Sequence, residues 1–390
     1  MSADLILVGG GLANGLIALA VAAQDSDRRM LMIDDGTGAV SGGHTWSFHD
    51  TDLDPRQHRW IASAVAHRWP GQEVRFPGFT RALRTGYASL TDASLGAALD
   101  RLPGLSRLHA RAAGIGADKV TLADGTTLRG PCVIDGTGRI PAAHLVLGWQ
   151  KFVGIEIETD APHGRDVPII MDATVSQHDG YRFVYTLPFS DRRILVEDTH
   201  YTDGSALTEG DLAAAIIAYA AAQGWRGTEI RRERGVLPIA LAFDAAGFWR
   251  QAQGGAVPVG MRAGLFHPVT GYSLPLAAQV ADRIAAAPPT TAAAFAAVRD
   301  FALDTARRQG FPRLLSRMLF RGARPEGRRA VLERFYRLPE PLIERFYAGR
   351  LIAADRARIL IGKPPIPIRA ALPCLREAPL LAALPKEPAP

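Results

Sequence analysis

A glycine-rich turn lies between two short apolar segments at the start of the chain. Residues 5–8 are apolar, Gly9–Gly11 follow, and after an apolar stretch a second segment, 30–33, ends at Asp34. This order predicts a strand, a tight turn, a helix and a second strand. Glycines let a pyrophosphate approach the backbone, the helix N-terminus offers unpaired N–H groups, and the acid can bind a ribose. The segment therefore predicts a dinucleotide-binding Rossmann unit.

The glycine pattern departs from the usual fingerprint at one position. Its third glycine is replaced by Asn14, and Gly15 comes one residue later. A short asparagine still allows the helix to pack closely on the strand, although an ordinary glycine-rich turn is the alternative interpretation. The predicted ligand contacts here are Gly9, Gly11, Asn14 and Asp34.

The same segment has 19 residues without a charge, from Leu5 to Ala23. A membrane span or a signal peptide is therefore an alternative to the Rossmann unit. Against it, no basic residue precedes the run, and the three consecutive glycines interrupt any helix. We favour a buried strand followed by a turn and a helix in a soluble protein.

The rest of the chain alternates strand-like and helical patterns. Extended segments are expected at 152–158, 169–173, 181–187 and 194–200, with hairpin turns at 123–125 and 188–192, and helices at 212–223 and 275–287. We predict an α/β fold: a Rossmann-like domain (1–50, 85–150 and 240–306), an antiparallel-sheet substrate domain (51–84 and 151–239), and a basic helical C-terminal region (307–390). Residues 364–367, Pro-Pro-Ile-Pro, are expected to end the regular structure.

The positive charge is concentrated near the C-terminus. The chain has a net charge of +6, yet 16 basic and 5 acidic residues lie between Arg307 and Arg369, whereas 27 basic and 32 acidic residues precede Arg307. The protein is thus a mildly acidic body with one arginine-rich segment. Only two cysteines, Cys132 and Cys374, are present, so no disulfide framework is possible and a reducing compartment is expected.

Several motifs occur in the order found in one superfamily. The N-terminal turn, the strand end Asp135-Gly136 and the late glycine-rich segment 260–275 resemble those of flavin-containing hydroxylases and monooxygenases. Finer motifs resemble bacterial lycopene β-cyclases of the flavoprotein type. These are His44-Thr-Trp-Ser-Phe48, Met171-Asp-Ala-Thr174, Gly180-Tyr-Arg-Phe183, Leu195-Val-Glu-Asp-Thr199 and Phe266-His-Pro-Val-Thr-Gly-Tyr-Ser-Leu-Pro275.

The resemblance implies a flavin-dependent isomerase. It would close the acyclic ends of lycopene and related carotenes into β-ionone rings, lycopene to γ-carotene to β-carotene, with FAD active in its reduced form and NAD(P)H as the reductant. The superfamily usually has Gly-Asp before the late helix, but here Met261 follows Gly260, which puts the ribityl contact in doubt. Further cofactor contacts implied are Asp135, Gly136, Gly260, Gly271, Tyr272 and Ser273.

Ring closure begins with a proton delivered to C2 of the end group, so an acid must hold a proton in an apolar pocket. The resemblance assigns this role to Glu197, which matches the catalytic glutamate of the plant motif F-L-E-E-T. Strand alternation places Glu197 on the face of Leu195 and Thr199, and Asp198 on the opposite face. From periodicity alone, a surface carboxylate on an edge strand is an equally good interpretation.

Aromatic and histidine side chains are candidates to line the substrate site. Tyr181, Phe183 and Tyr185 share one strand face, where they either wall a tunnel or fill the core. The remaining candidates are His44, Trp46 and His267. No metal site is expected, because the histidines show no H-x₃-H pair and no cysteine partner.

The arginine-rich segment has apolar residues at helical spacing, including Phe311, Leu314 and Leu315. Because a carotene lies in the bilayer, we expect the segment to lie on anionic lipid, with the enzyme cytoplasmic and peripherally bound to the inner face of the membrane. A face packed on the protein body is the alternative. A nucleic-acid partner is not expected, since no recognised motif accompanies the charge. The alternative activity is a flavin monooxygenase or a prenyl reductase acting on an isoprenoid lipid.

Overall fold

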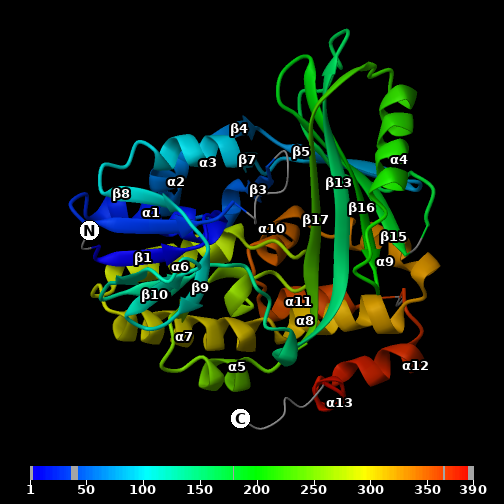
Figure 1. Cartoon of the computed structure of the whole chain (residues 1–390). Helices are drawn as coiled ribbons and strands as arrows, with labels where there is room; N and C mark the ends of the chain where they lie inside the picture. The colour runs from blue at the N-terminus through cyan, green and yellow to red at the C-terminus, as the bar shows by residue number, and fades with distance from the viewer. Residues whose placement is uncertain (1–2, 37–42, 179, 363–364, 385–390) are drawn as a thin grey trace.

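A parallel sheet forms the first half of the molecule in the computed structural model, which describes residues 3–36, 43–178, 180–362 and 365–384 (Figure 1). Its order is β18 (Val257–Pro258), β12 (Val133–Asp135), β1 (Leu5–Val8), β2 (Met30–Asp34) and β8 (Leu105–His109), and every neighbouring pair is parallel. The first strands are buried apolar runs, as expected of a parallel sheet covered on both faces. The predicted strand, turn, helix and strand of residues 5–34 are confirmed.

Helices and two small sheets surround this parallel sheet. Helix α1 (Leu12–Gln24) packs against α6 (Leu274–Ala286), which packs against α7 (Thr291–Arg308). The small sheets are β9 (Ala112–Ile115), β10 (Lys119–Leu122) and β11 (Thr127–Arg129), and β3 (Thr45–His49), β7 (Tyr87–Thr91) and β4 (Val65–Trp69). The remaining helices of this part are α2 (Pro55–Ile61), α3 (Asp92–Leu99) and α5 (Ala245–Gln251).

A seven-stranded sheet forms the second half, on the right of Figure 1. Its order is β17 (Gly227–Phe243), β13 (Leu145–Thr159), β16 (Arg193–Thr202), β15 (Tyr181–Pro188), β14 (Ile169–Asp172), β5 (Gln72–Phe76) and β6 (Phe79–Leu83). All neighbouring pairs are antiparallel except β14 and β5. Strand β13 is much longer than the sequence pattern at 152–158 indicates.

The two faces of the seven-stranded sheet have different coverings. Helix α4 (Glu209–Ala222) covers one face, where Val153, Ile155 and Val196 contribute to the core. The opposite face packs against the C-terminal region, where Leu195 and Tyr185 meet residues such as Phe320. Leu195 and Val196 thus belong to different cores, which confirms the predicted alternation along this strand.

The C-terminal region consists of short helices that pack against the large sheet: α8 (Gly310–Arg317), α9 (Arg328–Tyr336), α10 (Glu340–Tyr347), α11 (Ala353–Leu360), α12 (Ile368–Ala371) and α13 (Ala378–Ala382). In Figure 1, α12 and α13 lie at the bottom of the molecule. Three of its arginines point inward: Arg313, Arg317 and Arg328 are 7%, 3% and 1% exposed. Arg328 donates to the backbone oxygens of Leu319 and Tyr201. Some of the arginines of this segment therefore make hydrogen bonds inside the protein. This agrees with the alternative prediction, in which the segment packs on the protein body.

One expectation about this region is wrong. Regular structure continues past residues 364–367, because α12 begins directly after Pro367 and α13 follows. Proline is tolerated at a helix N-terminus, where its missing N–H would be unpaired in any case. Pro364 itself lies outside the described residues. The hairpin turns expected at 123–125 and 188–192 are confirmed, since each lies between paired antiparallel strands. No helix among the described residues is long and apolar enough to cross a bilayer.

Candidate active site

The glycine turn after β1 is held close to its neighbours. Gly9 has a φ of +99°, and a Cβ there would lie 2.6 Å from the carbonyl oxygen of Gly136. A Cβ on Gly10 would lie 2.6 Å from Oδ2 of Asp34. The turn therefore passes between the end of β12 and the carboxylate that ends β2. A side chain at Gly9 would meet backbone in a left-handed conformation, and one at Gly10 would displace the Asp34 carboxylate.

Gly11 and Asn14 differ in what surrounds them. A Cβ on Gly11 would meet nothing within 4 Å, and no side chain caps helix α1, which begins next to it. Asn14 is fully buried, and its Nδ2 donates to the oxygens of Val8 (2.9 Å) and Gly9 (2.8 Å). Asn14 thus holds the turn in place through two side-chain hydrogen bonds. The glycine that usually occupies this position has no side chain and could not make them.

The late glycine segment approaches the same turn. Gly260 has a φ of +56°, and a Cβ on it would lie 2.9 Å from the Cβ of Ala13. Asp135 accepts from the Nε of Arg262 at 3.1 Å and from Thr137. The position of Met261 is usually an aspartate in the superfamily. Here the carboxylate in this part of the site is that of Asp135, and the guanidinium of the next residue, Arg262, is paired with it.

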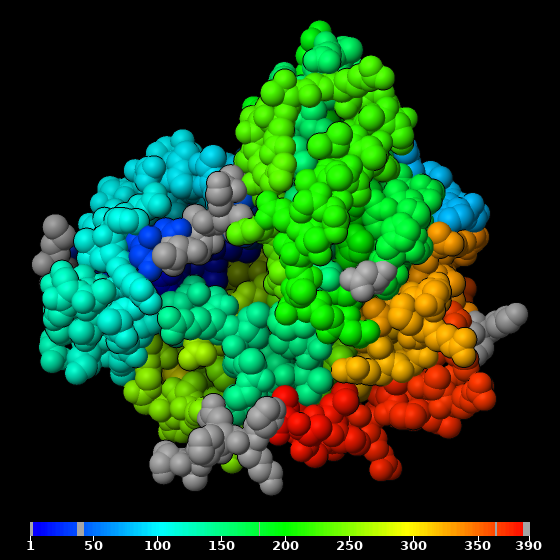
Figure 2. Space-filling view, turned by 45° about the vertical axis from the view of Figure 1, so that its right-hand side comes forward, coloured from blue at the N-terminus to red at the C-terminus, as the bar shows by residue number. Residues whose placement is uncertain are grey.

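Gly271 and Ser273 lie where helix α6 begins. Gly271 has a φ of +70°, and a Cβ there would lie 2.9 Å from the Cβ of Leu237 in the large sheet. Ser273 occupies the N-cap position, but its side chain makes no capping hydrogen bond. Helix α6 therefore presents uncapped N–H groups next to the junction of the two main sheets. Figure 2 shows a hollow between the blue and cyan N-terminal part and the green strands.

Glu197 lies on β16 with its side chain directed toward the face that the C-terminal region covers. It is 9% exposed, and the hydroxyl of Thr199 donates to its Oε1 at 2.7 Å. Burial raises the pKa of Glu197 to about 8; the negative charges of Glu233 and Asp198 add to this rise, and the Thr199 hydrogen bond opposes it. The carboxyl is therefore largely protonated at neutral pH.

A second buried carboxyl, Glu233 on β17, lies on the same face. Gly154 lies on β13, between β16 and β17, and is paired with Glu197 on one side and with Glu233 on the other. A Cβ on Gly154 would lie 3.0 Å from the Cγ of Glu233. The absence of a side chain at Gly154 therefore makes room for the Glu233 side chain, and Cδ1 of Leu195 approaches the same position at 3.2 Å.

Asp198 has the opposite environment, on the α4 side of the strand. Arg182 donates to both of its carboxylate oxygens at 2.7–3.1 Å, and His200 Nε2 lies 3.2 Å from Oδ1. Although burial opposes it, hydrogen bonds from His200 and Arg182 lower the pKa of Asp198. Two adjacent acids on one strand thus have pKa values moved in opposite directions.

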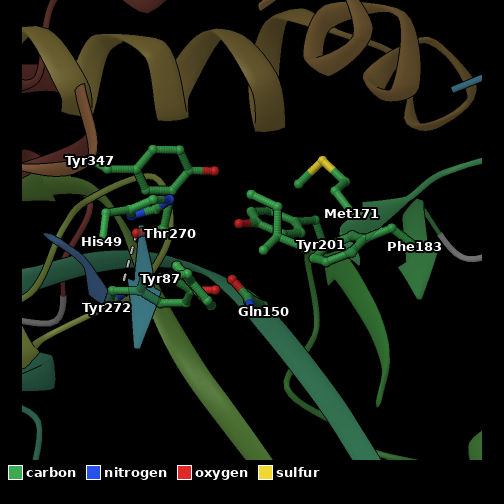
Figure 3. Close-up of a pocket in the computed structure, with 10 residues that line it drawn as sticks. His49, Tyr87, Gln150, Met171, Phe183, Tyr201, Thr270, Tyr272 and Tyr347 are labelled. Carbon is green, nitrogen blue, oxygen red and sulfur yellow. Dashed lines mark hydrogen bonds between the residues drawn. The ribbon is translucent and has the colours of Figure 1, made fainter. Parts of the chain in front are cut away.

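An aromatic wall continues from Glu197 along the sheet. Tyr185 is paired with Glu197 in the register, and its hydroxyl donates to Ser47 Oγ (2.9 Å) and lies 3.2 Å from the hydroxyl of Tyr87. Tyr87 in turn lines a small inner pocket of about 320 Å³. Figure 3 shows its lining: His49, Tyr87, Thr270, Tyr272 and Tyr347 on one side, and Met171, Phe183 and Tyr201 on the other.

A larger outer cavity of about 1050 Å³ adjoins the inner pocket. Met171, Tyr201, Thr270 and Tyr347 line both spaces. The remaining wall is almost wholly apolar and comes mainly from the C-terminal helices; it includes Leu319, Val331, Leu332, Phe335, Leu360 and Ile366. An apolar passage thus leads from the aromatic wall to the surface near α11, where Leu360 is 48% exposed.

Of the other residues predicted to line the substrate site, some lie at the inner pocket and others lie away from it. Phe183 lines the inner pocket, whereas Tyr181 is fully buried and stacks on it with ring centroids 5.5 Å apart. His44 stacks on Trp46 at 5.8 Å, and its Nδ1 lies 3.6 Å from Asp92. Both interactions lie beside β3, on the Glu233 side of the site.

His267 is part of the core packing. Its Nε2 is 3.0 Å from the oxygen of Phe346, the N–H of Val269 donates to its Nδ1, and burial lowers the pKa of the imidazole to about 4. A neutral ring with both nitrogens engaged ties the late glycine segment to α10. Within the described part of the chain, no group of three or more His, Cys, Asp or Glu side chains could hold a metal ion.

Glu233 and the outer cavity are two features of the site that the sequence patterns do not indicate. Glu233 lies in the charged run Glu229–Arg234, which resembles a solvated strand edge. Only the register of β17 on β13 brings it opposite Gly154. The cavity is built from residues up to 200 positions apart in the sequence, such as Met171 and Ala371, and no local pattern indicates it.

Two solved structures share this architecture. The match to a flavin-dependent halogenase from Xanthomonas campestris covers 98% of this chain and 96% of the halogenase chain, with a TM-score of 0.59 and 13% sequence identity. A geranylgeranyl bacteriochlorophyll reductase-like protein from Thermoplasma acidophilum covers 93% and 97%, with a TM-score of 0.56 and 14% identity. At these identities the likeness concerns the fold alone. It confirms the predicted class, an α/β protein with the Rossmann-type fold of flavoenzymes and an added antiparallel sheet.

The particular family follows from the sequence comparisons. The profile of the family described as "Lycopene cyclase protein" matches residues 4–372. A lycopene beta-cyclase of Paracoccus sp. (strain N81106 / MBIC 01143) is 57% identical over 386 residues, covering 98% of this chain and 99% of its own. One of Pantoea ananas is 49% identical over 372 residues, covering 95% and 97%. The chain belongs to the lycopene cyclase family, and the resemblance indicated by its motifs is confirmed.

Proposed function

We propose that this protein closes the acyclic ends of lycopene into β-ionone rings without net oxidation or reduction, giving γ-carotene and then β-carotene. The observation that carries the proposal is Glu197, a buried carboxyl with a pKa of about 8 that is paired with Tyr185, whose hydroxyl contacts Tyr87 in the wall of the inner pocket. Such a group holds a proton at neutral pH and can deliver it to a carbon–carbon double bond. Few other reactions of an apolar polyene need a desolvated acid of this kind.

The chain's residues fit FAD as the cofactor. The space beside Gly11 at the uncapped N-terminus of α1 suits a pyrophosphate. Within the described residues, nothing donates to the carboxylate of Asp34, which leaves it able to bind a ribose. Gly260, Gly271, Tyr272 and Ser273 would lie along the remainder of FAD, and Asp135 with Gly136 at the end of β12. Residues 1–50, 85–150 and 240–306 would form the FAD-binding domain.

Bound reduced FAD would supply negative charge near the site, and NAD(P)H would keep it reduced. This chain's own residues would perform the proton chemistry. Glu197 gives its proton to C2 of the end group, C1 becomes cationic, and the C5=C6 double bond attacks C1 to close the ring. The aromatic residues Tyr185, Tyr87 and Tyr272 exclude water, so that no nucleophile traps the cation. Loss of the C6 proton restores neutrality.

The apolar spaces support a long polyene as the substrate. The reacting end would lie beside Glu197, and the remainder of the chain would extend through the inner pocket into the outer cavity. Of the predicted substrate domain (51–84 and 151–239), residues 72–83 and 151–239 would hold the substrate, whereas α2 and β4 pack with the parallel-sheet half. The C-terminal region would complete the cavity. The near absence of polar groups in the outer wall matches a hydrocarbon ligand.

We further propose that the protein binds the lipid surface on the cytoplasmic side of the membrane through an apolar rim. The rim consists of the exposed apolar residues of the segment 352–375, in which Leu360 also lines the outer cavity: Ile352, Leu360, Ile361, Ile368, Leu372 and Leu375, each 48–67% exposed. Arg356, Arg358, Arg369 and Arg376 are exposed in the same segment. Apolar side chains with arginines between them suit an anionic lipid surface, from which a carotene would enter the cavity.

The activity is tested anaerobically. Purified protein, lycopene in liposomes and chemically reduced FAD are combined without nicotinamide. We expect β-carotene under these conditions. If product formation instead consumed hydride in proportion to product, the protein would be a prenyl reductase, and a requirement for oxygen would indicate a monooxygenase.

The acid is tested by Glu197→Gln, with Glu158→Gln as a matched control on an exposed part of β13. We expect the first variant to fold, bind FAD and lose at least about a hundredfold in turnover, and the control to keep wild-type turnover. Undiminished β-carotene from Glu197→Gln in lycopene-producing cells would refute the assignment.

Membrane binding is tested by flotation with vesicles of phosphatidylcholine and phosphatidylglycerol at low salt. The double substitution Ile361→Glu and Ile368→Glu should reduce the bound fraction severalfold. Ile217→Glu, on α4 and equally exposed, should leave binding unchanged. Equal binding of both variants would exclude the rim as the docking surface.

A further inference from the structure

Ring closure releases a proton from C6, and the site contains a second carboxyl placed to accept it. We propose that Glu233 is this acceptor, so that the proton donor Glu197 and the proton acceptor Glu233 are separate carboxyls on either side of Gly154. The inference rests on the proposed cyclisation and assigns one of its steps to a residue that no motif indicated.

The register of three strands fixes the arrangement. Gly154 on β13 pairs with Glu197 on β16 and with Glu233 on β17, so the three residues form a row across the sheet. Tyr185 on β15 extends the row past Glu197. Because a Cβ at Gly154 would lie 3.0 Å from the Cγ and 3.4 Å from the Oε1 of Glu233, that carboxylate extends over the glycine. The row thus places the two carboxyls on the same face of the sheet, on either side of Gly154.

The two carboxyls differ in the side chains that contact them. Within the described residues, no basic side chain contacts Glu197, and its one hydrogen bond comes from Thr199. Glu233, which is 2% exposed, accepts at Oε2 from Arg231 (2.6 Å) and Thr45 (2.9 Å). Arg231 is held in place by a further hydrogen bond to Glu156 (3.0 Å). Burial raises the pKa of Glu233, and the contact with Arg231 opposes this rise by favouring the ionised form. Because Glu233 has a guanidinium partner and Glu197 has none among the described residues, Glu233 is the member of the pair suited to accept a proton.

The free oxygen of Glu233 has the correct position for this role. Both partners of the carboxylate bind Oε2, and Oε1 takes no hydrogen bond within the described part of the chain. It is Oε1 that lies near Gly154. One oxygen therefore anchors the carboxylate, and the other faces the space between the two acids.

The step balances as an isomerisation. The O–H bond of Glu197 breaks as the C2–H bond forms, and the electron pair of C5=C6 forms the C1–C6 bond, which leaves a cation at C5. The C6–H bond then breaks, its electron pair forms the new C5=C6 double bond, and its proton goes to Oε1 of Glu233. Return of that proton to Glu197, directly or through water, restores the enzyme with no net change in protons or electrons.

The acceptor's position has a chemical consequence that can be measured. A C5 cation can lose a proton from C6, from C4 or from the methyl group on C5, and each loss gives a ring with the double bond in a different place. A carboxylate held over C6 selects the β ring. If Glu233 is the acceptor, removing its charge will slow ring formation and allow loss of the other protons.

The experiment compares Glu233→Gln and Glu233→Asp with the wild type, all loaded with reduced FAD and supplied with lycopene in liposomes. Glu229→Gln, a matched change on an exposed part of the same strand, is the control. Turnover and the ratio of β rings to their double-bond isomers are measured by chromatography and NMR. We expect Glu233→Gln to be at least about tenfold slower than Glu233→Asp, or to yield the isomeric rings. Glu229→Gln should match the wild type.

Two results would overturn the proposal. One is Glu233→Gln forming only β rings at a rate within threefold of the wild type. The other is equal impairment of the Gln and Asp variants with β rings alone, which would mean that the charge at position 233 does not matter. A wild-type protein that forms no ring at all would instead contradict the proposed cyclisation.

Discussion

The raised pKa of Glu197 has a consequence for stability that can be measured without any substrate. The folded protein holds a proton on this carboxyl up to a pH of about 8, whereas the unfolded chain releases it near the ordinary value of 4.5. As the pH rises between these values, the unfolded chain releases the proton while the folded protein still holds it. This release lowers the free energy of the unfolded state relative to the folded state. The wild type should lose stability with rising pH in this window, and the loss should be complete above pH 8.

Glu197→Gln removes this penalty because glutamine has nearly the same shape and does not ionise. At about 1.4 kcal/mol for each pH unit between 4.5 and about 8, the gain of the variant over the wild type amounts to about 1 kcal/mol at pH 5 and about 5 kcal/mol at pH 9. A variant with little activity should therefore be markedly more stable than the wild type in alkali.

The assay is urea unfolding of both proteins, with equal flavin loading, at pH 5 and at pH 9. Glu158→Gln serves as the control, since Glu158 is exposed and its substitution should produce the same small difference at both values. A stability difference between Glu197→Gln and the wild type that does not change with pH, or that grows toward acid, would refute the argument that burial holds a proton on this group.

Three other substitutions test further parts of the site. Thr199→Val removes a hydrogen bond that favours the charged form of Glu197, a contact worth about 1.5–3 kcal/mol, so the alkaline limit of the rate–pH profile should move upward by about one unit or more. Asn14→Ala leaves the Gly9 oxygen without its donor and removes one of two donors to the Val8 oxygen, which the Gly136 N–H also contacts. It should lower the free energy of unfolding by about 1–2 kcal/mol in urea, with faster loss of flavin on gel filtration. Arg328→Ala should cost about 3–5 kcal/mol in the same unfolding assay, whereas the exposed Arg324→Ala should change stability by less than about 0.5 kcal/mol.

Local patterns were sufficient for the parts of the molecule that depend on neighbours in the sequence. The turn Gly9–Gly11, the strand that ends at Asp34 and the alternation around Glu197 follow from spacing and residue type. Each involves a backbone requirement or a two-residue period, which a single chain displays directly. Asn14 is an intermediate case: its departure from the glycine pattern was visible, but its two buried hydrogen bonds were not.

The remaining features depend on contacts between distant segments. Glu233 becomes a site residue only because β17 pairs with β13 in one particular register. Arg317 and Arg328 belong to a segment whose composition suggests a solvated or lipid-facing surface, yet their side chains are buried. Charge in a sequence does not distinguish a guanidinium in water from one that binds internal carbonyl oxygens.

Most residues that line the outer cavity come from a different part of the sequence from the two carboxyls. Glu197, Glu233 and Gly154 belong to the large sheet, while Leu319, Val331 and most of the cavity belong to residues after 310. The length and shape of the accepted hydrocarbon can therefore diverge among relatives without alteration of the proton chemistry. Chimaeras that exchange the segment after residue 310 between two such enzymes would transfer the preference for chain length and leave the ring type as it is in the parent sheet.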